Sequence, residues 1–218
     1  MPITINPFDA EIISDEELAL WKTVPSAVAC DAMNRTNGMI ADIQSLVPDT
    51  ILAGQALTVH APNGTNAPLH HAVKCALPGC ILVIDAKNLR DKAVWGSVVN
   101  AYALTCGVRG LIFDGCVRDT ALLKQSDMPI FCRGSAPNGP TKEEVGGVNI
   151  PITCGGVTVH PGDIIIGDDD GIAVIPFKTR QPVLEKCQDR MAEKEDWKKK
   201  TQDGVSTAEL WKLTPPKS

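Results

Sequence analysis

Hydrophobic and polar positions follow two periods along this chain of 218 residues. Residues 53–60 alternate between apolar and polar, which predicts a strand. Residues 80–85 are continuously apolar up to an aspartate, as expected for a buried strand of a parallel sheet. The pattern as a whole predicts helices at 14–24, 26–37, 69–77, 98–106, 119–126 and 179–200, and strands at 53–60, 80–85, 110–113, 130–132, 147–154, 157–159, 163–167 and 172–175. These elements give an α/β fold whose second half is rich in short strands.

The stretch from residue 95 to residue 119 has the most informative pattern. A Gly turn is followed by a helical segment, an apolar strand, and the pair Arg118-Asp119. Ligands bind at the carboxyl ends of strands in open α/β sheets, and the pair stands at such an end. Arginine offers a fork for a carboxylate, and aspartate offers a hard oxygen ligand for Mg²⁺. A surface salt bridge is an alternative, and Asp119 has the residue type of an N-cap for the helix after it.

Charge and composition exclude several classes of protein. The formal net charge of −5 argues against a nucleic-acid partner and against binding to a membrane surface. The chain opens without a signal-peptide pattern and contains no run of 18 apolar residues, so we expect a cytoplasmic protein without a membrane partner. We expect one domain with arms, long enough to bury a core.

Two further features could indicate a metal site or disulfide bonds, but each has a simpler interpretation. The eight cysteines form no CxxC pair, and we expect buried free thiols. Asp168-Asp-Asp-Gly171 has consecutive acids between two strands, where a calcium loop needs alternating acids, so we expect a β-turn. The pair His70-His71 opens a predicted helix, and either histidine could face a pocket or simply be a core or surface residue.

Several motifs in a fixed order resemble the RraA-like superfamily. They are Trp95-Gly96, Gly107-Val-x-Gly110, Asp114-Gly-x-Val-Arg-Asp119, Gly155-Gly-Val-x-Val-x-Pro-Gly-Asp163 and Gly167-Asp-Asp-Asp-Gly171. This superfamily contains the regulator of ribonuclease E activity and divalent-metal aldolases that act on 4-hydroxy-4-methyl-2-oxoglutarate and 4-carboxy-4-hydroxy-2-oxoadipate. The resemblance implies a swivelling-type α/β/β sandwich over residues 1–176, a C-terminal helix and tail over 177–218, and a homotrimer or hexamer with active sites at subunit boundaries.

The resemblance also implies roles for particular residues. The turn Gly96-Ser97-Val98-Val99 would offer backbone N–H groups to the carboxylate of a 2-oxo acid. Arg118 would bind the same substrate and stabilise its enolate, and Asp119 would hold Mg²⁺ or Mn²⁺ as the Lewis acid. The implied activity is a metal-dependent lyase, an aldolase or oxaloacetate decarboxylase, that works through a pyruvate enolate.

Two positions depart from the aldolase pattern. Ser97 and Leu122 stand where the aldolases have acids, so we expect weaker binding of the metal. Glu193 and Glu195 of a neighbouring chain could compensate, although both have the pattern of solvated helix residues. Two alternatives to the lyase therefore stay open, a non-catalytic regulator of the ribonuclease-inhibitor kind and a metal-free reaction in the same anion pocket.

Overall fold

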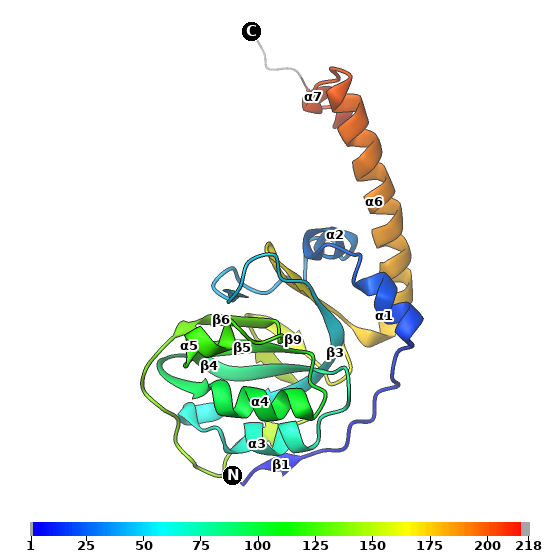
Figure 1. Ribbon diagram of the computed structural model, residues 1–218. Helices are drawn as coiled ribbons and strands as arrows, with labels where there is room; N and C mark the ends of the chain where they lie inside the picture. Colours follow the sequence, from blue (N-terminus) through cyan, green and yellow to red (C-terminus); the bar gives the residue numbers. More distant parts are fainter. Residues whose placement is uncertain (1, 215–218) are drawn as a thin grey trace.

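The computed structural model describes residues 2–214 and has a mixed β-sheet at its centre (Figure 1). Four neighbouring strands of this sheet are parallel: β3 (Leu52–His60), β4 (Ile81–Trp95), β5 (Gly110–Val117) and β6 (Ile130–Ser135). Shorter strands extend both edges, namely β1 (Thr4–Ile5) and β7 (Gly147–Val148) beside β3, and β2 (Gln44–Ser45) beside β6. Every residue of β5 is buried, as expected for a parallel strand covered on both faces.

Strand β3 belongs to two layers. Residues 56–60 pair in parallel with β4, whereas residues 52–55 pair antiparallel with β10 (Ile164–Asp168). Strand β10 continues into β11 (Gly171–Ile175) through the predicted turn, because Asp168 pairs with Gly171. The division of β3 joins the parallel sheet to a second β layer and confirms the swivelling-type α/β/β sandwich.

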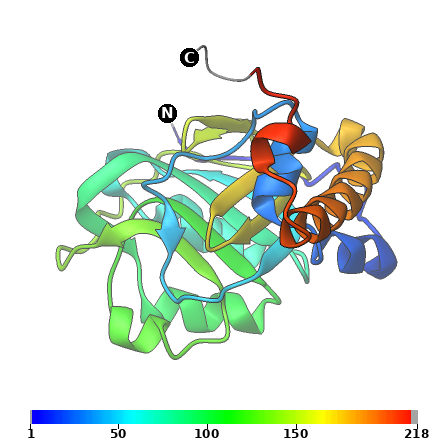
Figure 2. The same cartoon turned by 90° about the horizontal axis from the view of Figure 1, so that it is seen from above.

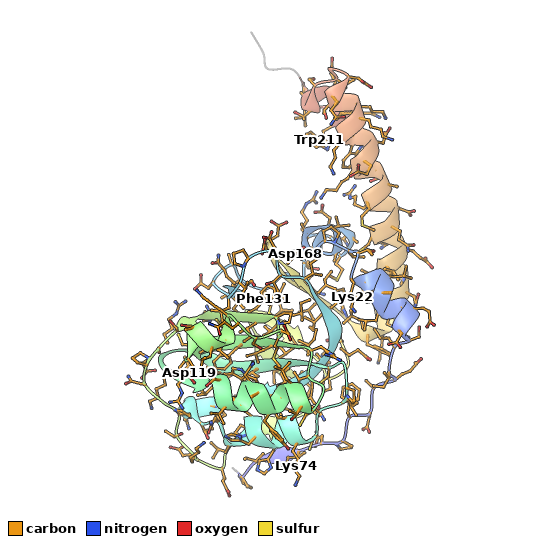
Figure 3. All side chains as sticks on the ribbon, viewed as in Figure 1. Lys22, Lys74, Asp119, Phe131, Asp168 and Trp211 are labelled. Atoms are coloured by element: carbon orange, nitrogen blue, oxygen red, sulfur yellow. The ribbon has the colours of Figure 1, made fainter. Side chains whose placement is uncertain are left out.

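Both faces of the parallel sheet are covered. On one face α3 (Ala67–Lys74) and α4 (Ser97–Thr105) pack on a core that includes Leu69, Trp95 and Phe113 (Figure 1). A hairpin of β8 (Ile152–Cys154) and β9 (Val157–Val159) contributes to a separate core that includes Phe131 (Figure 3). Short helical turns complete the connections: η1 (Pro62–Gly64), α5 (Thr120–Leu123) and η2 (Phe177–Thr179).

The terminal helices form a third packed unit. Helices α1 (Asp15–Trp21), α2 (Ser26–Ala32) and α6 (Arg180–Gln202) cover β10 and β11. The far half of α6 projects from the body and ends at α7 (Thr207–Leu210), where Trp197 and Trp211 pack edge to face at 6.3 Å (Figures 1 and 2). Residues 215–218 of the predicted tail lie outside the described residues. None of the helices in the described range has the length and apolar character needed to cross a membrane.

Several predicted elements differ in extent from the observed ones. The strand at 80–85 runs on to Trp95, and this continuation is polar and irregular, with register shifts after Ile84. The helix at 119–126 is a single turn, since later backbone N–H groups bond three residues back and Pro129 follows closely. The predicted strand at 147–154 is two short strands separated by Pro151, which has no N–H to donate.

Predicted free thiols and helix starts are confirmed. All eight cysteines are free, and Cys75 is the exposed one. Ser14 accepts the Glu17 backbone N–H at 3.1 Å and so caps α1. The Asp168 carboxylate accepts both the backbone N–H and the hydroxyl of Ser26, at 2.8 and 2.6 Å, so the acidic turn also holds the start of α2.

Candidate functional site

The predicted site forms where two adjacent parallel strands end together. Trp95, the last residue of β4, lies opposite Val117, the last residue of β5. The Arg118 backbone N–H donates to the Trp95 carbonyl at 2.9 Å. The start of α4 after β4 is therefore held beside the Arg118-Asp119 pair after β5.

Asp119 joins these two segments. Its backbone is left-handed, with φ 60° and ψ 36°, and its Oδ2 accepts the Ser97 backbone N–H at 3.0 Å and the Ser97 hydroxyl at 2.8 Å. The Ser97 hydroxyl and N–H, followed by the Arg118 cation, hold the pKa of Asp119 below its ordinary value. Asp119 stands at the predicted N-cap position of α5, but its side chain makes no capping hydrogen bond there and caps the start of α4 instead.

Two glycines make room for Arg118. A Cβ on Gly96 would lie 2.9 Å from Asp119 Oδ2 and 3.0 Å from Arg118 Cγ. A Cβ on Gly139 would lie 2.9 Å from Arg118 Nη1. Gly96 has an extended backbone that any residue adopts, so close approach, not conformation, requires glycine there. The guanidinium is thus confined between the α4 turn and the loop that contains Gly139.

A cavity of about 230 Å³ opens at this point. Its lining includes five of the six predicted site residues, which are Gly96, Val98, Val99, Arg118 and Asp119. Ser97 is not among the lining residues and is engaged with Asp119 instead. Val94 and Pro140 also line it, together with three polar residues that were not assigned to the site from the sequence, Asn66, His70 and Lys142.

These three polar side chains form one wall. Lys142 Nζ donates to Asn66 Oδ1 at 2.8 Å and lies 3.4 Å from His70 Nε2. Burial, followed by the nearby Lys142 and His71, lowers the pKa of His70, so this imidazole is neutral at pH 7. An ammonium can only donate, so Nε2 of His70 faces it as an acceptor. The cavity therefore carries two cations, Arg118 and Lys142, and one carboxylate, Asp119.

Backbone hydrogen bonds hold the loop that carries Lys142. The Asn138 carbonyl accepts from the Ala93 N–H at 2.8 Å, and the Thr141 N–H donates to the Gly64 carbonyl at 2.8 Å. The Asn66 N–H donates to the Thr141 carbonyl at 3.3 Å. The loop is thus tied to β4 at one end and to the start of α3 at the other.

The start of α4 has free backbone N–H groups and a fixed position. The first N–H groups of a helix have no intrahelical partner, and Asp119 satisfies the one at Ser97, which leaves those of Val98 and Val99. Trp95 Nε1 donates to Asn100 Oδ1 at 3.2 Å, and Asn100 donates to the Ser126 hydroxyl at 2.9 Å. This buried chain fixes α4 to the sheet.

The donor set permits only a minimal metal site. Within residues 2–214 no three His, Cys, Asp or Glu side chains gather as a metal cluster. Asp119 Oδ1 accepts no hydrogen bond from the described residues, and Mg²⁺ is often held by one carboxylate together with water and substrate oxygens. Leu122 is 59% exposed on α5 and does not line the cavity. Asp119 is therefore the residue of this chain that fits the metal.

The sandwich fold and this site define a class of α/β/β proteins with a small cavity, lined by two cationic side chains, at the carboxyl ends of β4 and β5. The family model RraA-like, described as Aldolase/RraA, matches residues 26–174, and the chain belongs to this family.

Known relatives include a protein named as an aldolase and a member of the RraA inhibitor family. A protein of Halalkalibacterium halodurans named "Putative 4-hydroxy-4-methyl-2-oxoglutarate aldolase" is 36% identical over 185 residues, covering 85% of this chain and 88% of that protein. The crystal structure of Streptomyces coelicolor RraAS2, an unusual member of the RNase ES inhibitor RraA protein family, superposes with a TM-score of 0.77 at 25% identity, over 88% of this chain and 98% of that one. An uncharacterised protein from Pseudomonas syringae has the same fold, with a TM-score of 0.78 at 24% identity over 90% and 97% of the two chains.

Proposed function

We propose that the chain is a lyase that breaks a carbon–carbon bond of a small 2-oxo acid and leaves a pyruvate enolate. The observation that carries the proposal is the confinement of the Arg118 guanidinium between Gly96 and Gly139, beside the free N–H groups at the start of α4. A planar cation and backbone donors at one point suit a carboxylate with an adjacent oxo group. The aldolase name of the Halalkalibacterium relative supports the same reaction class.

Each group of the cavity has a task in this reaction. The Val98 and Val99 N–H groups hold the substrate carboxylate, and Arg118 stabilises the negative charge that develops on the 2-oxo oxygen. Asp119 would hold Mg²⁺ or Mn²⁺ through Oδ1, and the ion would supply Lewis-acid polarisation of the oxo group. In oxaloacetate decarboxylation the C3–C4 bond breaks, its electrons form the enolate, CO₂ leaves and C3 takes a proton from water.

The wall formed by Asn66, His70 and Lys142 favours substrates with a second carboxylate. Lys142 is cationic, is held in place by Asn66 and His70, and lines the same cavity as Arg118. Two cations against the single carboxylate of Asp119 leave the cavity suited to a dianion. Decarboxylation is the simplest test reaction, because it needs enolate stabilisation but no base on the enzyme, and Ser97 cannot act as a base at pH 7.

The test is metal-dependent release of pyruvate from oxaloacetate, with the rate in buffer and metal alone subtracted. Arg118→Ala should lower kcat/KM by about 100-fold or more, as expected for loss of an oxyanion-stabilising donor. Arg109→Ala is the matched control, since Arg109 is exposed and does not line the cavity. A kcat/KM of Arg118→Ala within a few-fold of that of the unmodified protein would contradict the proposal.

A second candidate function is a binding protein of the regulator kind. Val98 and Tyr102 stand four residues apart on α4 and are 84% and 49% exposed, and Leu122 on the adjacent α5 is 59% exposed. This exposed apolar surface, which includes the cavity-lining Val98, and the structural similarity to RraAS2 favour the regulator function. Inhibition of a ribonuclease of the RNase E type that persists in Arg118→Ala and is lost in Tyr102→Ser would support this candidate.

A further inference from the structure

A second polar cavity lies at the carboxyl end of β3, where its parallel ladder with β4 stops. The parallel ladder between these strands ends at the pair His60 and Asp85. Asp85 is only 2% exposed, and His60 is partly exposed. The cavity has a volume of about 310 Å³ and is lined by His60, Asp85 and Lys87, and by Ile150, Pro151, Ile152, Thr153 and Thr158. None of these residues lines the cavity of Arg118.

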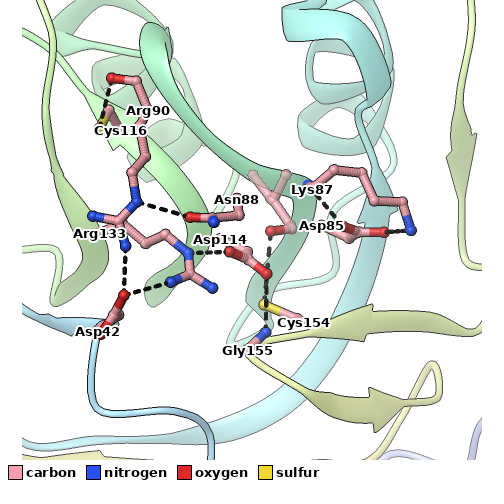
Figure 4. A network of polar contacts seen from close by, with 11 residues as sticks. Asp42, Asp85, Lys87, Asn88, Arg90, Asp114, Cys116, Arg133, Cys154 and Gly155 are labelled. Atoms are coloured by element: carbon pink, nitrogen blue, oxygen red, sulfur yellow. Dashed lines mark hydrogen bonds and ion pairs between the residues drawn. The ribbon is translucent and has the colours of Figure 1, made fainter.

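The backbone is distorted where the cavity begins. The register of β4 with β5 shifts after Ile84, and Lys87 and Asn88 have left-handed φ angles of 55° and 58°. Two consecutive residues other than glycine in this region are uncommon and costly, and such distortions cluster at binding sites. Here the distortion turns Lys87 back onto Asp85, so that both its backbone N–H and its ammonium reach that carboxylate (Figure 4).

Among His60, Asp85 and Lys87, some hydrogen-bonding atoms are already paired and others remain free for a ligand. Asp85 Oδ2 accepts from His60 Nδ1 and Lys87 Nζ, both at 3.0 Å, and Oδ1 accepts the Lys87 backbone N–H at 2.9 Å. The carboxylate is therefore satisfied and its charge is balanced by Lys87. Donation by Nδ1 places the free lone pair of a neutral His60 on Nε2, which has no partner among the described residues.

The remaining groups point to one class of ligand. Lys87 keeps two N–H donors, and the hydroxyls of Thr153 and Thr158 lie opposite one another on the β8–β9 hairpin. These donors suit a carboxylate, whereas Nε2 of His60 suits a hydroxyl that donates to it. The apolar part of the wall suits a short alkyl group. We propose that the cavity bounded by His60, Asp85, Lys87 and the β8–β9 hairpin binds a small hydroxy-carboxylate, independently of the site at Arg118.

The experiment compares lactate with propionate, which lacks the hydroxyl group, by NMR of the histidine imidazoles in the unmodified protein. The His60 signal is assigned as the one missing in His60→Gln, and the measurement is made at about pH 8, where an ordinary imidazole is neutral. Lactate should shift the His60 signal saturably, and propionate should bind about tenfold more weakly because one hydrogen bond is lost. Lys87→Met should abolish the lactate shift.

Two control variants separate this cavity from the first site. Lys74→Met removes an exposed lysine on α3 that lines neither cavity, and Arg118→Met disables the proposed lyase site; both should keep the lactate shift at His60 (Figure 3). A His60 signal that lactate leaves unmoved, or that propionate moves equally, would overturn the proposal. Loss of the shift in Arg118→Met, or its persistence in Lys87→Met, would overturn it as well. The comparison of lactate with propionate decides the question even where Lys87→Met fails to fold.

Discussion

The carboxylate of Asp119 caps the helix that begins at Ser97, twenty-two positions earlier in the chain. One oxygen, Oδ2, accepts both hydrogen bonds from Ser97, and Oδ1 accepts none from the described residues. The contact joins the segment after β4 to the segment after β5. Ser97 therefore positions Asp119 and does not line the cavity.

Removal of the Ser97 hydroxyl should raise the pKa of Asp119. In Ser97→Ala the backbone hydrogen bond and the Arg118 cation remain, so the pKa should move only part of the way back to its ordinary value of 3.8. The pKa of Asp119 is lowered in the folded protein, so its contribution to stability is present above pH 3.8 and is lost as the pH falls through the pKa of the folded state. Ser97→Ala should make this acid-dependent loss of stability smaller. Carboxyl ¹³C NMR titration measures the shift. Thr105→Ala is the control, because the Thr105 hydroxyl donates to the Tyr102 carbonyl within α4. An unchanged Asp119 titration would contradict the contact.

Ser97→Asp should raise the affinity for Mg²⁺ by roughly tenfold, because a second carboxylate would stand next to Asp119. Leu122→Glu should add little, since the Leu122 side chain is exposed on α5, whereas the Ser97 side chain contacts the Asp119 carboxylate directly. Calorimetric titration of Mg²⁺ into the single and double variants measures both effects. Equal gains from the two substitutions would show that α5 lies nearer to the metal than the structure has it.

Gly139→Ala should lower catalytic turnover with little loss of stability. The backbone of Gly139 is outside the left-handed region, so alanine is tolerated conformationally, but its Cβ would displace Nη1 of Arg118. We expect a loss of about tenfold or more in kcat/KM, a common result when a reacting group is moved by about 1 Å. Ser135→Ala in the exposed end of β6 is the matched control. Unchanged turnover in Gly139→Ala would show that Arg118 tolerates displacement.

A buried ion pair under the β8–β9 hairpin should stabilise the fold. Arg133 Nε donates to Asp114 Oδ1, the two side chains are 5% and 8% exposed, and Asp114 Oδ2 accepts the Gly155 N–H at 3.1 Å (Figure 4). Arg133→Met leaves a buried carboxylate without its cation and should lower the free energy of unfolding by about 3 kcal/mol. The exposed pair Arg190–Glu193 gives a control, since Glu193→Gln should cost less than about 1 kcal/mol. Urea denaturation measures both, and equal losses would contradict the effect of burial.

The local patterns predicted most of the α/β architecture and, together with the family resemblance, half of the residues that line the candidate cavity. The apolar run of β5 ends at Arg118-Asp119, so a site at a strand end could be recognised from these residues alone. The continuation of β4 to Trp95 could not be predicted, because polar residues such as Lys87 and Asp91 follow Asp85 and interrupt the apolar pattern of the strand.

The missing half of the site depends on contacts between distant segments. Lys142 meets Asn66 only because the loop after β6 is tied to the start of α3, and neither segment carries a motif for this. Asp119 has the predicted N-cap position of α5, but the residue type alone could not show that its side chain reaches Ser97 at the start of α4.

A structure with bound pyruvate and Mg²⁺ tests the central claim most directly. We predict that the pyruvate carboxylate accepts hydrogen bonds from the Val98 and Val99 N–H groups, that its 2-oxo oxygen contacts Arg118, and that the ion lies against Asp119 Oδ1. Pyruvate bound elsewhere, or the Arg118 guanidinium turned out of the cavity in the complex, would contradict the assignment of this cavity as a 2-oxo acid site.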